Sequence, residues 1–156
     1  MTMEQKNVAG VVIFLVWRQK FFMILRDDNP EIRSPNEWCP VTGGRDEEED
    51  FGQATLRELK EEIGFIPRDL ATLGVSHKGN GFFFGRLSDE EKDSIALGEG
   101  QCYGFFSYDE LFSIPIAGAM KIYLDRHPNV FRRMAETGLS PFGRELGLAT
   151  WNGPSP

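Results

Sequence analysis

The sequence predicts one α/β domain in which helices cover both faces of a mixed β-sheet. Short runs rich in Val, Ile and Phe, which are typical of buried strands, lie on both sides of one helical segment that begins near Phe51. A further helical segment follows the last strand. The 156 residues suffice for one buried core, and no repeat or linker divides the chain.

The strands before the first helix are predicted from apolar runs. Val8–Val16 is rich in Val and Ile and predicts a buried strand. Phe21–Arg26 predicts a second strand after a short turn. Asp27–Asn36 is polar and contains two prolines, so a loop is expected there. Trp38–Thr42 then leads into a Gly-Gly pair ahead of the helix.

The second half of the chain predicts three more strands and two helices. The strands are Thr72–His77, Phe82–Leu87 and Gln101–Phe106. The acidic segment Ser88–Asp93 is expected on the surface. A short helix is expected at Ser107–Phe112, with Ser107 as its N-cap. A longer helix is expected at Ile116–Arg126.

The C-terminal region differs from the rest in composition. We therefore divide the chain into a domain, residues 1–138, and a Gly/Pro-rich tail, residues 139–156. The tail carries large apolar side chains, and burying one stabilises a protein by about 1.5–3 kcal/mol. We expect the tail to dock on its own domain or on a second subunit, which makes a homodimer a candidate assembly. A disordered tail is the alternative that its composition permits.

Charge and cysteine content limit the classes of partner. The net charge of −7 and pI near 4.9 argue against a groove for long nucleic acid. A small phosphorylated substrate remains compatible, because bound cations invert the local field. The apolar run Val8–Trp17 is too short to span a bilayer. Only Cys39 and Cys102 are present and the start lacks a signal-peptide pattern, so we expect a cytoplasmic protein with reduced thiols.

Residues 43–65, GGRDEEEDFGQATLRELKEEIGF, carry the strongest functional signal. Asp50 and Gln53 resemble a capping box, and Gly64 suits the left-handed residue that ends a helix. Glu58, Glu61 and Glu62 are predicted to share one helix face. An apolar stripe is predicted on the opposite face, formed by Leu56, Leu59 and Ile63.

Three carboxylates on one helix face repel one another. A helix that needed only solubility would intersperse Lys among them, so a cation is expected on this face. A divalent cation with oxygen ligands is the natural candidate. The alternative is a solvated acidic helix, which most Glu-rich faces are.

This segment resembles the Nudix box, G-x5-E-x7-R-E-U-x-E-E-x-G-U with U apolar, at all nine fixed positions. The resemblance implies an α/β/α sandwich with a mixed sheet and a metal-dependent hydrolase. It implies that Glu58 and Glu62 are the main metal ligands and that Glu61 is a further ligand or a base. The carbonyl of Gly43 would join the metal shell, and Arg57 would orient the site.

Two further glutamates have open roles. Glu49, the remaining acid of the box, would brace the loop and helix or bind another metal, or is one more solvated acid. Glu99 lies between two glycines before an aromatic strand. The resemblance implies a metal ligand or general base there, and the alternative is a plain turn residue. Glu90 and Glu91 are weaker rivals for that role.

Other candidate residues carry weaker signals. His77 and His127 lack spacing partners and are more often structural or surface residues. Three aromatic side chains could stack on a nucleobase, namely Trp17, Trp38 and Phe84. Aromatic residues in strands are more often part of the core. The box is entered by Val-Thr-Gly-Gly rather than Pro-Gly-Gly, and the marks of several Nudix subclasses are missing.

The expected reaction is hydrolysis of a diphosphate bond in a nucleoside diphosphate derivative. Mg²⁺ fits carboxylates and phosphate oxygens, and Mn²⁺ also fits. A small nucleotide is the expected partner, with a nucleoside triphosphate as the first substrate class. A nucleotide sugar (an NDP-sugar or ADP-ribose) is the runner-up. The rival classes are a Nudix module that senses a nucleotide without turnover and a scaffold that binds partners through its tail.

Overall fold

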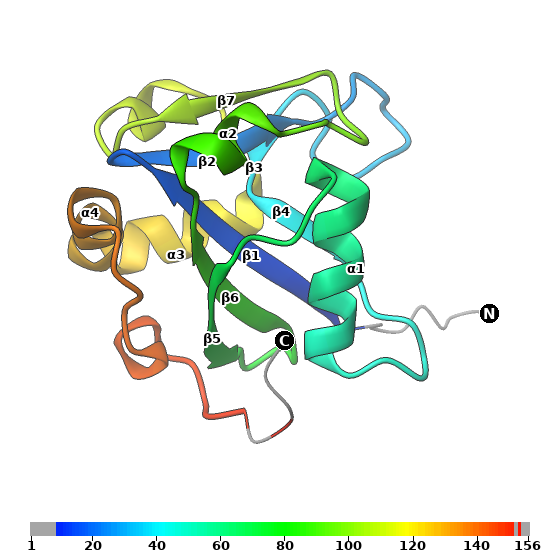
Figure 1. Cartoon of the computed structure of the whole chain (residues 1–156), viewed down its shortest axis with the longest axis vertical. Coiled ribbons are helices and arrows are strands. Elements are labelled where there is room, and N and C mark those ends of the chain that lie inside the picture. The colour runs from blue at the N-terminus through cyan, green and yellow to red at the C-terminus, as the bar shows by residue number, and fades with distance from the viewer. Residues whose placement is uncertain (1–8, 152, 154–156) are drawn as a thin grey trace.

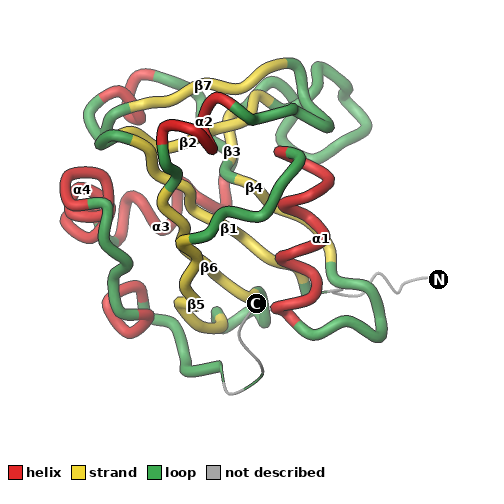
Figure 2. The backbone as a smooth tube through the Cα atoms, in the orientation of Figure 1, coloured by secondary structure: helices red, strands yellow, loops and turns green. Residues whose placement is uncertain are grey.

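The computed structural model describes residues 9–151 and 153 (Figures 1 and 2). The predicted start of the first strand at Val8 and both ends of the chain lie outside these residues. No helix in the described part is long and apolar enough to cross a membrane.

Seven strands form one mixed sheet. Its main path runs β3-β2-β1-β6-β5, while β4 pairs with β1 and β7 pairs with β2. β1 and β6 are parallel, and the other pairs are antiparallel. The mixed sheet predicted from the sequence is therefore confirmed. The strands are β1 (Gly10–Trp17), β2 (Lys20–Leu25), β3 (Trp38–Cys39), β4 (Val41–Gly44), β5 (Asp69–Val75), β6 (Gly81–Arg86) and β7 (Cys102–Phe106).

Helices cover both faces of this sheet, as Figure 1 shows. Side chains alternate along β1, so residues of one parity pack against α1 (Phe51–Ile63) and the others against α3 (Gly118–Arg126) and α4 (Pro128–Thr137). Phe14 packs on the α3 and α4 side, while Ile13 packs on the α1 side. The α/β/α sandwich is confirmed.

Two helices do not have the bounds that the sequence predicted. The helix predicted from Ile116 begins at Gly118, because the segment before it pairs with Trp38. The Trp38 N–H donates to the Pro115 carbonyl at 2.7 Å, and the Ala117 N–H donates to the Trp38 carbonyl at 2.8 Å. The helix predicted at Ser107–Phe112 is a 3₁₀ turn at Glu110–Ser113, and the predicted acidic surface segment contains the short helix α2 (Asp89–Asp93).

The sequence analysis missed helix α4 entirely. Pro128 occupies its first turn, where a missing N–H costs nothing. Phe131, Met134 and Ala135 are its buried residues, at the i, i+3, i+4 spacing of an amphipathic helix. Both signals were present in the sequence.

The tail packs on its own domain. Ala149 and Val75 exchange two backbone hydrogen bonds of 2.9 Å, which add the tail to the edge of β5. Leu146 and Leu148 are buried in the core beneath it. Phe142, in contrast, is 64% exposed. The ring of Trp151 meets those of Phe51 and Phe83 edge-on, at centroid distances of 5.9 and 6.1 Å.

Deleting residues 139–156 is expected to lower the free energy of unfolding by about 3–6 kcal/mol, because two buried leucines are lost at about 1.5–3 kcal/mol each. At about 2–4 °C per kcal/mol, the melting temperature should fall by roughly 10 °C. Calorimetry would measure the change. Phe142→Ala is the control within the tail, with an expected change of less than about 0.5 kcal/mol. An unchanged melting temperature in the deletion would contradict the packing described above.

Candidate active site

Helix α1 begins and ends where its sequence predicts. The Gln53 N–H donates to Asp50 Oδ1 at 2.7 Å, and the Asp50 N–H donates to Gln53 Oε1 at 3.0 Å, which completes the capping box. Gly64 has φ 92° and its N–H donates to the Leu59 and Lys60 carbonyls. These caps fix the register of every glutamate on the helix.

The predicted separation of acidic and apolar faces on α1 is wrong. Glu58 and Glu62 are only 7% and 8% exposed, and they lie beside Leu59 on the buried side of the helix. At about 100° per residue, positions 58, 59 and 62 fall within one third of the circumference. Glu61 is exposed instead, and Leu56 is only partly buried.

Gly43 lets the Glu58 carboxyl approach the backbone of β4. A Cβ atom at Gly43 would lie 1.9 Å from Glu58 Cδ, so only glycine permits this contact. Antiparallel pairing of Gly43 with Val11 holds the strand in place. The structure thus brings two predicted residues, one from a strand and one from a helix, into direct contact.

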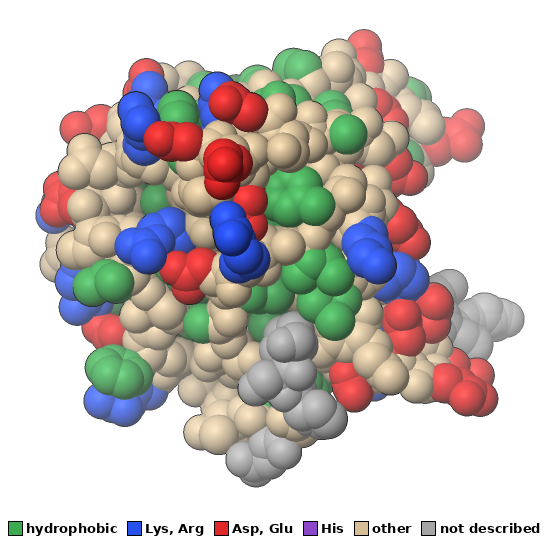
Figure 3. Space-filling view, in the orientation of Figure 1, with side chains coloured by type: hydrophobic (Ala, Val, Ile, Leu, Met, Phe, Trp, Pro, Cys, Tyr) green, Lys and Arg blue, Asp and Glu red, His purple; other side chains and the backbone are tan. Residues whose placement is uncertain are grey.

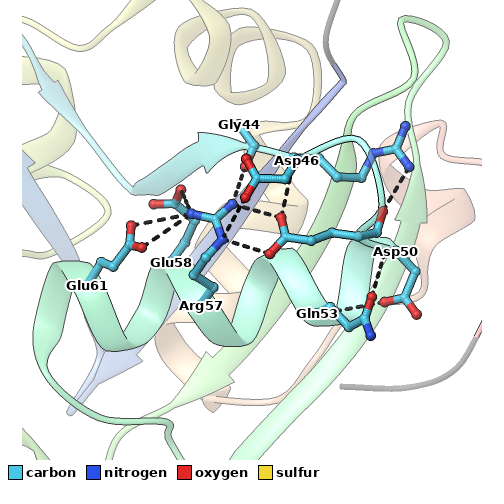
Figure 4. A network of polar contacts seen from close by, with 9 residues as sticks. Gly44, Asp46, Asp50, Gln53, Arg57, Glu58 and Glu61 are labelled. Atoms are coloured by element: carbon cyan, nitrogen blue, oxygen red, sulfur yellow. Dashed lines mark hydrogen bonds and ion pairs between the residues drawn. The ribbon is translucent and has the colours of Figure 1, made fainter.

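Arg57 binds the loop before α1 to the helix (Figure 4). Its Nε and Nη2 donate to the two carboxylate oxygens of Glu49 at 2.7 and 2.9 Å. Nη2 also donates to the Gly44 carbonyl at 2.9 Å, and Nη1 donates to Glu58 Oε1 at 3.0 Å. The contact with Glu61 is longer, at 3.3 Å. Arg57 therefore orients Glu58.

Glu49 sits at the other end of this network. The Arg57 guanidinium, with a backbone hydrogen bond from Asp46, lowers the pKa of Glu49 to about 2. Acidic side chains gather over this loop at the lower right of the molecule in Figure 3. Glu49 connects the loop with the helix through these contacts.

Glu99 lies beside Glu62 because its segment is bonded to the end of α1. The Ala96 N–H donates to the Ile63 carbonyl at 2.9 Å, and the Gly98 N–H donates to the Glu62 carbonyl at 3.0 Å. A Cβ atom at Gly98 would lie 1.8 Å from the Glu61 carbonyl oxygen. Gly98 therefore lets the segment that carries Glu99 pack directly against the backbone at the end of α1.

The buried carboxylates affect one another. Burial, together with the negative charges of Glu99 and Glu58, raises the pKa of Glu62 to about 7. Burial also raises the pKa of Glu58, which the Arg57 guanidinium opposes. Repulsion of this kind is relieved when a cation binds between the carboxylates.

The donor set fits a hard divalent cation. Among the described residues, no three His, Cys, Asp or Glu side chains are already grouped as a metal site. Mg²⁺ does not need such a cage, because it binds through one or two carboxylates, retained waters and substrate phosphates. Glu58 and Glu62 from α1, with Glu99 from the neighbouring loop and the Gly43 carbonyl, would supply the protein oxygens.

Two adjoining cavities meet at the turn between β3 and β4. The acidic cavity, about 490 Å³, is lined by Glu62, Glu99 and Asp27 among others. The second cavity, about 290 Å³, is lined by Phe14 and Phe82 among others. Four residues line both cavities, and they are Arg26, Cys39, Pro40 and Thr42. The sequence analysis missed Arg26, whose only signal was a charge at the end of a buried strand.

The weaker candidates lie elsewhere. Glu90 is 92% exposed, and Glu91 caps α2 through Ser88. His77 is exposed, and His127 lies between α3 and α4. None of the three aromatic residues considered for stacking lines either cavity, namely Trp17, Trp38 and Phe84. Both cysteines are free, and burial raises the pKa of the Cys39 thiol.

The raised pKa of Glu62 predicts how metal-free stability depends on pH. An unfolded chain loses the Glu62 proton near pH 4.5, whereas the folded protein keeps it until about pH 7. The free energy of unfolding should therefore fall as pH rises through this window, by up to about 3 kcal/mol at ~1.4 kcal/mol per pKa unit.

Urea unfolding with EDTA at pH 5 and pH 8 would measure this effect. Glu62→Gln carries no titrating group, so its stability should depend much less on pH and exceed that of the wild type at pH 8. An equal pH dependence in both proteins would contradict the burial of an ionisable Glu62.

A family model described as NUDIX domain matches residues 6–116 of this chain. The match includes the whole segment from Gly43 to Phe65 and continues to the strands and cavities around it. A search of curated protein sequences found no match.

Solved structures share the fold. The NUDIX domain of Shewanella oneidensis NrtR, complexed with ADP ribose, has a TM-score of 0.61 at 15% identity, covering 79% of this chain and 87% of that one. A MutT protein from Methanosarcina mazei Go1 has a TM-score of 0.61 at 17% identity, covering 87% and 100%. A C. elegans Ap4A hydrolase has a TM-score of 0.53 at 22% identity, covering 78% and 95%. At these identities the likeness establishes the fold.

Proposed function

This chain belongs to the Nudix family of hydrolases, and from that premise we propose that it hydrolyses a nucleoside triphosphate to a nucleoside monophosphate and pyrophosphate. One molecule of water is consumed. Its oxygen forms a bond to the α-phosphorus, and the bond between that phosphorus and the oxygen bridging to the β-phosphate breaks, so that pyrophosphate leaves. The observation that carries the proposal is the pair of Glu62 and Glu99, which line one cavity, with Glu58 close enough for its charge to raise the pKa of Glu62.

Each residue contributes a separate part of this chemistry. Glu58 and Glu62 would hold Mg²⁺, which supplies charge neutralisation at phosphate and a more acidic bound water. Arg57 holds Glu58 in one orientation through the 3.0 Å hydrogen bond. Glu99 would accept a proton from the attacking water or add a ligand oxygen, and the backbone bonds of its segment to α1 support this role. Glu61 is exposed beside Arg57 and would act only as an outer ligand.

Two observations favour the triphosphate as substrate class. The acidic cavity is large enough for a polyphosphate with bound cations, and Arg26 lies where it adjoins the second cavity. MutT proteins and a dihydroneopterin triphosphate pyrophosphohydrolase are among the proteins that share the fold. The ADP-ribose complex of the NrtR domain supports a nucleotide sugar as the second class.

A substrate panel would test the proposal. Nucleoside triphosphates, NDP-sugars and ADP-ribose would each be incubated with Mg²⁺, or with Mn²⁺, and the products separated by ion-exchange chromatography. Pyrophosphate released only from triphosphates is the expected result. Monophosphate and sugar phosphate from a nucleotide sugar would move the assignment to the second class, and tight binding without product would indicate a sensing module.

The cytoplasm is the compartment we propose. Cys39 and Cys102 are free thiols, as is typical of a reducing environment. Nucleotides and Mg²⁺ are the partners that the proposed reaction needs.

A further inference from the structure

The two adjoining cavities differ in charge. The charged side chains that line the acidic cavity include Asp27, Glu62 and Glu99. The second cavity, which we call the donor cavity, is lined by Arg26 and Arg33, and no carboxylate from residues 9–151 lines it. In a chain with net charge −7, such a local excess of cations marks a place for electron-rich ligand atoms.

The arginines of the donor cavity are not neutralised by neighbouring acids. The ion pairs among the described residues include neither Arg26 nor Arg33. Arg26 Nε donates to the Arg33 carbonyl at 2.6 Å, which holds the two residues together. An arginine has donors and no acceptor, so both side chains offer N–H groups to a ligand.

A third residue adds a hydrogen-bond donor to the cavity. Asn80 lines the donor cavity, and its Oδ1 accepts the Gly10 N–H at 2.8 Å. This bond fixes the orientation of the Asn80 amide, so its Nδ2 group is available as a donor to a ligand. Among the described side chains that line the cavity, the hydroxyls of Ser34 and Thr42, and more weakly the thiol of Cys39, can either donate or accept.

The floor of the donor cavity is apolar. It is formed by Phe14 from β1, Phe82 from β6 and Met120 from α3, all of which are buried. The rings of Phe14 and Phe82 lie 5.9 Å apart. A flat ring suits such a floor, with its polar edge directed at the donors.

We infer that the donor cavity binds the ring of the substrate and selects a ring edged with carbonyl oxygens over one edged with amino groups. The inference rests on the proposed function for the identity of the attached diphosphate. An amino group facing an N–H donor leaves both without partners, and a site built for one hydrogen-bonding pattern rejects the other. Uracil and hypoxanthine carry a carbonyl where cytosine and adenine carry an amino group of similar size.

Matched pairs of nucleotides test the selection. Titration calorimetry would compare UMP with CMP, and IMP with AMP, and kinetics would compare UTP with CTP. The carbonyl member of each pair should bind, and react in kcat/KM, about tenfold or more better. Values within threefold of each other, or a preference for the amino member, would overturn the inference.

Arg26→Gln tests which group the arginine recognises, because glutamine both donates and accepts. The variant should bring the ratio of UTP to CTP in kcat/KM towards one. Arg68→Gln, an exposed arginine after α1, is the matched control and should keep the ratio. Equal losses for both substrates with an unchanged ratio would overturn the assignment of Arg26 to the ring and place it on the diphosphate.

The outcomes separate this inference from the proposed function. Triphosphates that are cleaved without discrimination would refute the selection and leave the reaction standing. Discrimination between UMP and CMP in a protein that cleaves no triphosphate would support the selection and refute the reaction.

Discussion

Replacing Glu62 with Gln should lower turnover by at least about 100-fold, a rise of about 2.7 kcal/mol in the activation barrier. The substitution preserves the shape of the side chain and removes its charge. Glu62 is buried beside Glu58 and Glu99, and within residues 9–151 no Lys or Arg forms an ion pair with it, so its carboxylate is well placed to bind the metal. The fold should remain intact, because the amide is easier to bury than the carboxylate.

Steady-state kinetics with Mg²⁺ would measure this effect, and calorimetry would measure the affinity for Mg²⁺ in parallel. Glu90→Gln makes the same chemical change at an exposed position and should retain full activity. Turnover of the Glu62 variant within about threefold of the wild type, or roughly 0.7 kcal/mol of barrier, would remove Glu62 from the metal site.

Glu99→Gln is expected to lower kcat by about 100-fold or more while the melting temperature does not fall. General base catalysis typically contributes about 10²–10⁴-fold, and loss of a metal ligand has a comparable cost. The side chain lies beside Glu62 and its removal reduces carboxylate repulsion, so no stability is lost.

Glu91→Gln is the informative comparison for this variant. Glu91 accepts the Ser88 N–H through Oε1 and the Arg68 N–H through Oε2, both at 2.9 Å. Glutamine retains one acceptor oxygen and replaces the other with an NH2 group, so Glu91→Gln should lower stability slightly and leave kcat unchanged. If the Glu99 variant kept full activity and the Glu91 variant lost most of its kcat, the role of general base or metal ligand would belong to Glu91 on α2.

The pH profile of kcat separates the two roles of Glu99. A general base would impose an acidic limb that disappears in Glu99→Gln. A metal ligand would instead change the Mg²⁺ concentration needed for half-maximal rate. Either result would support a role for Glu99 in the active site. If the variant showed neither effect, Glu99 would be a turn residue without a role in catalysis.

Local sequence signals predicted the box helix and most strands correctly. Asp50, Gln53 and Gly64 act through contacts within a few residues, and so the ends of α1 follow from their identity alone. Five strands were predicted to within a few residues, because runs of Val, Ile and Phe indicate burial, whereas β3 and β4 were not predicted as strands. Helix α4 was missed although its Pro128 and its apolar spacing were visible.

The features that failed depend on long-range packing. Glu58 was predicted on an acidic face opposite the apolar stripe, whereas contact with Gly43 brings its buried carboxyl against a strand. Arg26 had no motif to mark it, and its place between two cavities comes from pairing of β2 with β3 and β7. Trp17 and Trp38 have a size that suits stacking, but their strands direct them away from the cavities.

The most direct test of the whole account follows the phosphorus atoms of one substrate. The protein would be incubated with UTP and Mg²⁺, and ³¹P NMR would identify the products before and after EDTA is added. The account predicts that signals of uridine monophosphate and pyrophosphate grow together and stop growing when the metal is removed. Release of orthophosphate with a nucleoside diphosphate, or product formation that continues in EDTA, would contradict it.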